Sequence, residues 1–393
     1  MESPWLLSSV LGALLASQAT LWMLRRRHLD RWIWSYIHES HTRYLPKPDE
    51  TVHLILCIAD HYEPLFGGVS LQQGRRRVEH WLQAYPEQFG RFRDSDGRTP
   101  RHTFFFPAEQ YDAELLEPLT QLCASGFGEV EIHLHHDNDT AANLRRTLCE
   151  FRDALAQRHG LLARRPTGEP AYAFIHGNWA LCNSRPDGRY CGVDNELAIL
   201  LETGCYVDMT MPSAPSPTQT SIINRIYYAK DRPGPRAHHF PCTPGEGLML
   251  IQGPLLLDWA KRKWGLLPRI ENACLQATQP PSLERLQLWL KARVQIPQRP
   301  DWFFVKLHAH GAPEDAHDVL LGPPMVRFHE ALASEATRNP HFHYHYVTAR
   351  EMYNLARAAE QGYRGSIADA LDFELQPGLA LPRSAMVATR NVN

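Results

Sequence analysis

The sequence lacks an excess of charge of either sign, because 41 Lys and Arg residues face 43 Asp and Glu residues in a chain of 393. The formal net charge of −2 provides no global basic field, so the composition excludes a protein that binds nucleic acid electrostatically. No Cys-x-x-Cys pair occurs among the eight cysteines, which excludes a zinc ribbon and favours free thiols. Internal repeats and low-complexity tracts are also missing. What remains is a globular chain long enough to bury a large core.

Charged residues are missing altogether from 3–24, and about 20 apolar residues suffice to cross a bilayer. Trp5 and Trp22 stand near the two ends of this segment, where aromatic residues favour the membrane interface. Three arginines (25–27) follow it, whereas a cleaved signal peptide usually carries its basic residues before the apolar run. We therefore expect residues 1–24 to form a single-pass anchor in the inner (cytoplasmic) membrane, with the body on the cytoplasmic side. A buried or interfacial helix is the alternative.

Residues 25–50 mix charges with the apolar side chains of Trp32, Trp34, Tyr36 and Ile37, and they end at a Pro-Lys-Pro break. This pattern is typical of an amphipathic helix that lies beside a membrane. A helix packed on the body of the protein fits the same pattern.

From residue 51 onward, short β-branched or aromatic runs alternate with longer helical patterns, which indicates an α/β fold with a parallel sheet. Polar clusters follow several of the strands, at the edge that carries the active site of a β/α barrel. We expect one domain over 51–360, with a long loop over 212–247 and an irregular tail over 361–393. The expected strands are 51–59, 101–106, 130–134, 171–175, 204–208, 302–307 and 342–347. The expected helices are 72–85, 113–125, 143–158, 197–202, 283–293, 328–336 and 348–360.

A dense group of potential metal ligands follows the expected strand 130–134. Three histidines and two aspartates fall within seven positions, namely His133, His135, His136, Asp137 and Asp139. Neutral imidazole and carboxylate are the ligands that suit zinc and similar divalent ions. The group therefore predicts a metal site, and a solvated polar loop is the alternative.

Two further strands deliver side chains suited to acid–base chemistry. Asp60 and His61 follow the first strand, and a carboxylate beside a metal can take a proton from water. His308 and His310 follow a late strand and share one face, so that either could protonate a leaving group. A turn residue at Asp60 and packed strand histidines are the alternatives.

The order of these segments resembles the polysaccharide deacetylase family, the NodB-type fold of carbohydrate esterase family 4. The segments that carry the resemblance are Ile58-Ala-Asp-His61, Thr103-Phe-Phe-Phe106, Glu131-Ile-His-Leu-His-His-Asp-Asn-Asp139 and Lys306-Leu-His-Ala309. The resemblance implies a distorted (β/α) barrel of about seven parallel strands, of the glycoside hydrolase and deacetylase type.

The resemblance also implies roles for individual residues. Asp60 is similar in position to the catalytic base, and His308 to the general acid. The metal, expected to be zinc, takes His61, His135 and Asp139 as ligands, with His133, His136 and Asp137 as alternates. The segment that shapes the substrate groove of the family is replaced here, so we expect substrate contacts from His176, Asn178, Trp179 and His310.

The implied function is metal-dependent removal of acetyl groups from a carbohydrate polymer or oligosaccharide of the cell envelope or an exopolysaccharide. Another metal-dependent amidase or phosphoesterase on the same barrel is one alternative. A catalytically inactive, membrane-bound scaffold that binds polysaccharide is the other. Hydrolysis of acetylated sugars, compared with that of phosphate esters, distinguishes the two enzymes.

Overall fold

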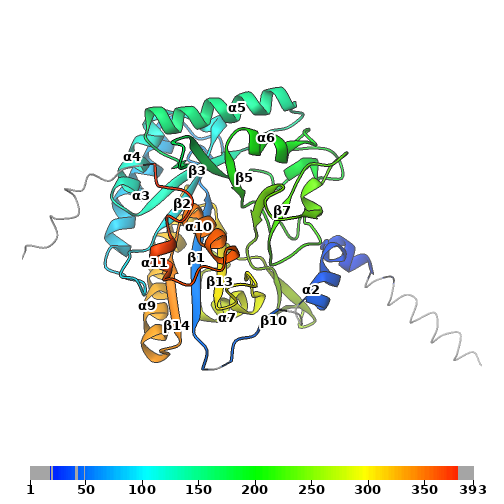
Figure 1. Cartoon of the computed structure of the whole chain (residues 1–393), viewed down its shortest axis with the longest axis vertical. Helices are drawn as coiled ribbons and strands as arrows, with labels where there is room; N and C mark the ends of the chain where they lie inside the picture. The colour runs from blue at the N-terminus through cyan, green and yellow to red at the C-terminus, as the bar shows by residue number, and fades with distance from the viewer. Residues whose placement is uncertain (1–17, 19–20, 40–42, 48, 379–393) are drawn as a thin grey trace, which may run out of the picture.

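One large sheet organises the computed structural model of the chain, which describes residues 18, 21–39, 43–47 and 49–378 (Figure 1). Nine described strands of the sheet run parallel to one another, namely eight along its main path and β14 (Phe342–Tyr346), which lies off that path. The spatial order of the eight is β12 (Cys274–Leu275), β13 (Trp302–Ala309), β1 (Val52–His61), β2 (His102–Pro107), β3 (Gly128–Leu134), β5 (Pro170–His176), β6 (Cys205–Asp208) and β9 (Leu248–Ile251).

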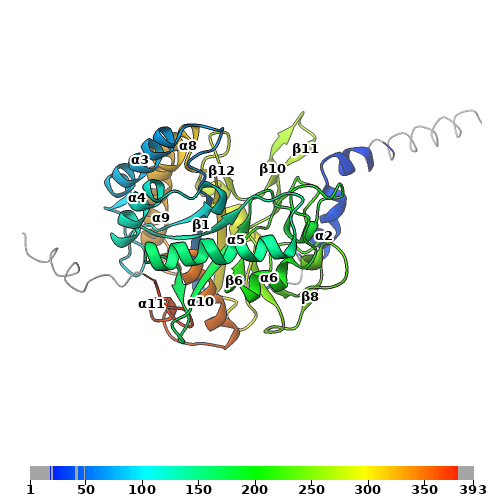
Figure 2. The same ribbon diagram turned by 90° about the horizontal axis from the view of Figure 1, so that it is seen from above.

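Shorter strands complete the sheet at its margins. Strands β7 (Ile226–Ala229) and β8 (Pro241–Cys242) extend it in antiparallel fashion beyond β9, and β4 (Ala163–Arg164) pairs antiparallel with β5. Strand β14 (Phe342–Tyr346) pairs with the first half of β1, whose last residues pair with β2 instead. Strands β10 (Leu256–Lys263) and β11 (Leu267–Glu271) form a separate hairpin that projects from the body (Figure 2).

The predicted α/β class and the largely parallel sheet are therefore confirmed, but the closed barrel is not found. Within the described part of the chain, no ladder joins the β12 edge of the sheet to the β8 edge. The predicted loop over 212–247 also contains β7 and β8. The apolar and aromatic run of β7 pairs with β9 there, so tertiary pairing overrides the surrounding Pro and Gly residues.

Successive residues of β1 point to opposite sides of the sheet. Each side therefore carries an apolar core, and helices cover both. Leu54, Leu56 and Ile58 belong to one core cluster, whereas Ile55 and Cys57 belong to another. The helices are α3 (Leu71–Phe89), α4 (Ala113–Ala124), α5 (Ala141–Asp153), α6 (Glu196–Glu202), α7 (Leu283–Ala292), α8 (Glu314–Leu320), α9 (Pro323–Arg338), α10 (Ala349–Glu360) and α11 (Ile367–Ala370).

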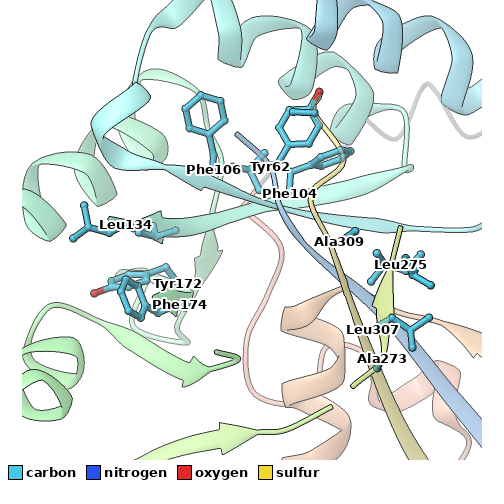
Figure 3. Packing of buried hydrophobic residues seen from close by; sticks show 14 of the residues in the cluster. Tyr62, Phe104, Phe106, Leu134, Tyr172, Phe174, Ala273, Leu275, Leu307 and Ala309 are labelled. Carbon is cyan, nitrogen blue, oxygen red and sulfur yellow. The ribbon is translucent and has the colours of Figure 1, made fainter. Parts of the chain in front are cut away.

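The two clusters show which helices face which side of the sheet. Trp81 of α3 and Leu115 of α4 belong to the cluster of Leu54, and Met352 of α10 belongs to the other. Figure 3 shows Tyr62 and Phe104 grouped where strands β1 and β2 meet the overlying helices. Polar residues cap several helix starts, so that the chain leaves each strand in a defined direction. These caps are Ser70, Asp112, Thr140, Ser282 and Thr348.

The segment after the predicted anchor packs on the body of the protein. It contains a short 3-10 turn (Leu29–Arg31) and α2 (Ile33–Glu39). Leu29 and Trp32 are buried against Ile223 and Leu255, and Arg27 donates a hydrogen bond of 3.0 Å to the carbonyl oxygen of Pro268 in the hairpin. The side chains of this segment therefore pack on the loops beyond β6 as well as on one another, as the edge-on contact between Trp32 and Tyr36 shows.

Most of the predicted anchor over 1–24 lies outside the described residues. Among the helices that the structure does describe, none combines the length and the apolar character needed to cross a bilayer. The predicted placement as a single-pass protein of the inner membrane is corrected by this finding.

A buried ion network holds helix α10 against the edge of the sheet where the parallel strands begin. Glu351, which is 2% exposed, accepts hydrogen bonds from Arg98 at 2.5 Å and from Arg101. Its second oxygen accepts the backbone N–H of Thr348 at 2.9 Å and so closes a capping box at the start of α10. Although burial alone would raise the pKa of the Glu351 carboxyl, Arg101, Arg98 and Arg350 hold it below its ordinary value of 4.5.

We expect Glu351→Gln to lower the free energy of unfolding by about 3 kcal/mol at neutral pH, because it leaves buried arginines without their partner. The pKa of Glu351 is lower in the folded state, so its contribution is present above pH 4.5 and is lost as the pH falls below that value. Urea unfolding of wild type and variant at pH 7 and at several pH values between 4.5 and about 2 measures both effects.

Glu330→Gln is the matched control, because Glu330 pairs with Arg91 at 3.3 Å with both side chains more than half exposed. It should change the unfolding free energy by less than about 1 kcal/mol at any of these pH values. A loss for Glu351→Gln that is as small as the control's would show that the network does not stabilise α10.

Candidate active site

The carboxyl ends of three neighbouring parallel strands bring the predicted functional residues together. Asp60 and His61 end β1, and β13 delivers His308 and His310 next to them, because Asp60 lies opposite Ala309 in the ladder. Strand β3 ends at Leu134, directly before the histidine cluster, and is separated from β1 only by β2. In open and closed parallel sheets this edge is where active sites form.

Glu63, which follows β1 and is 5% exposed, lies at the centre of the site. It forms one group of potential metal ligands with His61 and His310, and a second group with His133 and His135. Within each group, the potential ligand atoms lie within 4.8 Å of one another. The Oε1 atom of Glu63 is 3.3 Å from Nε2 of His133 and 3.7 Å from Nε2 of His135.

The partners of His133 and His135 fix which ring nitrogen carries hydrogen. Nδ1 of His133 donates to the carbonyl oxygen of Ile175 at 3.1 Å, since a carbonyl can only accept. Nδ1 of His135 donates to the carboxylate of Glu109 at 2.5 Å. Each neutral ring then turns the lone pair of Nε2 toward the carboxylate of Glu63. Two lone pairs that face a carboxylate repel it unless a proton or a cation lies between them.

The surroundings of Glu63 and of the nearby histidines determine their protonation states. Burial opposes ionisation of Glu63, but His133, His135 and His310, which attract the carboxylate when their rings are protonated, lower the pKa of Glu63. Burial, together with His133 and His310, lowers the pKa of His61 well below its ordinary range, and burial likewise lowers the pKa of His310. Burial thus favours the neutral rings of His61 and His310, as a metal requires of its ligands, whereas Glu109 and Glu63 raise the pKa of His135 despite burial, so an ion there would have to displace the proton of that ring.

A divalent ion fits this donor set. Imidazole nitrogens with one carboxylate are typical zinc ligands. Nδ1 of His61 is buried without a hydrogen-bond partner, which the presence of a ligand there would explain. Glu109 orients His135 through Nδ1, as outer carboxylates orient histidine ligands in metal sites. Glu63, which belongs to both groups, would therefore hold the ion together with His133 and His135 or with His61 and His310.

Asp60 is buried with both carboxylate oxygens engaged. Oδ1 accepts the backbone N–H of Gly311 at 2.7 Å, and Oδ2 lies 2.9 Å from Nε2 of His102. A Cβ atom on Gly311 would lie 2.1 Å from Oδ2, so this approach depends on the glycine. The contacts place His310, the neighbour of Gly311, against the ring of His61, with 4.7 Å between ring centroids.

The remaining members of the predicted ligand cluster lie elsewhere. Asp139 lies beside His136, at 3.2 Å between Oδ2 and Nδ1, and it joins neither of the two groups around Glu63. Asp137 accepts the backbone N–H of Tyr190 at 2.6 Å. His136 belongs to a different buried group, which also contains His176. The structure thus brings His61 and His135 together but leaves Asp139 apart from them.

A cleft of about 620 Å³ opens beside the site. His308, the expected general acid, lines it together with His310, Asn178 and Trp179, whereas His176, which was also expected to contact substrate, is fully buried. The ring of Trp179 lies 5.2 Å from that of His61, so the cleft leads to the group around Glu63. Burial and the nearby Lys306 lower the pKa of His308 well below its ordinary range.

Four acidic or thiol residues of the region were not predicted from the sequence: Glu63, Glu109, Cys191 and Glu196. Glu63 lies two positions after His61, and that spacing at a strand end could have indicated it. The other three come from a 3-10 turn, a long loop and the start of α6, and no local pattern marks them.

No family model and no curated protein matches the chain. Among solved structures, a Mycobacterium smegmatis protein described as a "putative polysaccharide deacetylase" matches with 12% sequence identity and a TM-score of 0.37. The match covers 81% of this chain and 93% of the other. A TM-score this low carries no argument, so the account of the site rests on the residues described above.

We expect Glu63→Gln and His135→Ala each to reduce the metal content of the purified chain by one ion, or to weaken zinc binding by about 10–100-fold or more. Each substitution removes a ligand atom from the group around Glu63. Elemental analysis after dialysis, and titration against a coloured chelator, measure content and affinity. Glu87→Gln, an exposed position of α3, should keep the wild-type content. Equal metal content in all four proteins would rule out this ion site.

Proposed function

We propose that this chain is a divergent metal-dependent hydrolase of the polysaccharide deacetylase type that removes acetyl groups from a carbohydrate. One observation carries the proposal. A buried carboxylate, Glu63, faces Nε2 of both His133 and His135, with His61 and His310 beside it, where a cleft opens at the carboxyl ends of the parallel strands. The motifs in these strands, in their order along the chain, resemble those of the deacetylases.

Each residue of the site would have a separate role in the reaction. A zinc-class ion held by Glu63 and the histidines supplies Lewis acidity toward an acyl oxygen and lowers the pKa of water. His308 lines the cleft and belongs to neither ligand group, so in our proposal it passes the proton to the departing sugar oxygen or nitrogen. Asp60, whose oxygens are taken by Gly311 and His102, positions His310 instead of acting as the base.

The lining of the cleft supports a neutral, hydroxyl-rich substrate. Amide and hydroxyl side chains dominate it, and Trp179 and Tyr190 offer flat apolar surfaces on which sugar rings can stack. Arg185 is the lining residue with a fixed positive charge, and Asp187 pairs with it at 2.9 and 2.7 Å. Among the described residues, the lining thus offers a phosphate ester no unpaired side-chain cation beyond the proposed ion itself. The polar lining residues are Asn178, Asn272, Gln276, Gln279, Ser213 and Ser216.

We expect the zinc-loaded protein to release acetate from acetylated sugar oligomers and to leave phosphate esters intact. Glu63→Gln and His308→Ala should lower the rate by about 10²–10⁴-fold, because they remove a metal ligand and a proton-transfer group. Acetate is measured by a coupled enzymatic assay on N-acetylated and O-acetylated oligosaccharides. His80→Ala, on an exposed position of α3, is the matched histidine control.

Two results would contradict the proposal. Hydrolysis of phosphate esters in place of acetylated sugars would favour a phosphoesterase. Binding of oligosaccharides with no acetate release from the metal-loaded wild type would favour a polysaccharide-binding scaffold.

A further inference from the structure

A second buried group of potential metal ligands lies on the other side of the His135–His136 peptide. It consists of His136, His176 at the end of β5, Cys191 in the following loop and Glu196 at the start of α6. Their potential ligand atoms all lie within 4.8 Å of one another. Glu196 is central, with Oε1 at 3.3 Å from Nε2 of His136 and Oε2 at 3.5 Å from Sγ of Cys191.

The burial of this group is extreme for side chains of such polarity. His176, Cys191 and Glu196 are each 0% exposed. Nε2 of His176 has no hydrogen-bond partner and lies 3.9 Å from Oε1 of Glu196. A buried ring nitrogen that is aimed at a buried carboxylate without reaching it leaves room for something between them.

His136 is held in the same way as the neighbouring His135. Its Nδ1 lies 3.2 Å from the carboxylate of Asp139, without the alignment of a hydrogen bond, and its Nε2 faces the carboxylate of Glu196. A carboxylate behind Nδ1 orients a histidine whose Nε2 binds a metal. The two adjacent histidines thus each lie between an orienting carboxylate and a buried one.

We propose that His136, His176, Cys191 and Glu196 bind one zinc-class divalent cation, separate from the ion at Glu63. Two imidazoles, a thiolate and a carboxylate make a four-ligand set suited to tetrahedral zinc, and the thiolate excludes calcium and magnesium. Binding would displace the thiol proton of Cys191 to solvent. Ligation through Nε2 of His176 would also give up the 3.2 Å hydrogen bond that its Nδ1 accepts from the N–H of Asn178.

The position of the site indicates what the cation would do. The loop between the ligands His176 and Cys191 carries Asn178, Trp179, Arg185 and Tyr190, which line the substrate cleft. Several residues of this loop hold the left-handed backbone conformation that side chains other than glycine rarely adopt. These are Trp179, Cys182, Asn183 and Tyr190, with φ angles of 53°, 53°, 52° and 68°. A cation that joins both ends of the loop to β3 and α6 would hold this strained wall in place.

Cobalt(II) substitution of the full-length chain tests the proposal, because a thiolate ligand gives cobalt a charge-transfer band in the near ultraviolet. We expect this band in the wild type and in Glu63→Gln. In Cys191→Ser we expect the band to disappear and the metal content to fall by one ion per chain. Cys123→Ser is the control for a buried thiol outside the group. The proposed ion site at Glu63 contains no cysteine, so the band would remain even if no metal bound there.

Limited proteolysis with trypsin supplies a second readout, which does not require any of the four ligands to be replaced. Arg189 lies in the loop between His176 and Cys191 and precedes Tyr190, so chelation should speed cleavage after Arg189, and added zinc should restore protection in both wild type and Glu63→Gln. A wild-type protein that takes up cobalt without the charge-transfer band would overturn the proposal. In that case the group would be a metal-free hydrogen-bonded cluster.

Discussion

The burial of the Glu63 carboxylate is the constraint on which the site depends. A carboxylate at the end of a strand would ordinarily turn to water, and here the chain prevents it. Arg77 of α3 donates to the carbonyl oxygens of Pro64 at 2.9 Å and Phe66 at 3.0 Å, and so fixes the turn that follows Glu63. Arg77 in turn pairs with Glu314 at the start of α8. Because the turn is fixed from outside, the carboxylate remains among the histidines of β3 and β13 despite the cost of desolvation.

The same edge of the sheet shows how an aspartate can serve a site without reaching it. Asp60 receives the N–H of Gly311 and lies against Nε2 of His102, so it joins the ends of β1, β2 and β13. This junction has no room for a side chain at position 311, where a Cβ atom would also lie 2.8 Å from Trp81. The sequence motif predicted Asp60 as the catalytic base, but the pattern could not show that both its oxygens are already engaged by Gly311 and His102.

Local periodicity accounts for what could be predicted. The alternation of strands and helices predicted the parallel sheet, and the polar residues after 51–59, 130–134 and 302–307 predicted which strand ends meet. Barrel closure could not be predicted, because it depends on pairing between edges far apart in sequence. The second ligand group could not be predicted either, since Cys191 and Glu196 come from a loop and a helix start with no repeating pattern. Side-chain alternation cannot place Asp139, because β3 ends at Leu134; the assignment of Asp139 to the ion of His135 came from the resemblance, and the turn carries Asp139 beside His136 instead.

The turn after β3 has a structural consequence for the wall of the cleft. His133 and His135 face Glu63, whereas His136 faces Glu196, so one peptide bond separates two ligand groups. Two glycines let the following loop close on this turn. A Cβ atom on Gly177 would lie 2.4 Å from the ring of His135, and one on Gly192 would lie 2.6 Å from the backbone nitrogen of Asp139. The loop that forms the cleft wall is therefore packed against both ligand groups, and a shift of either histidine would move the wall.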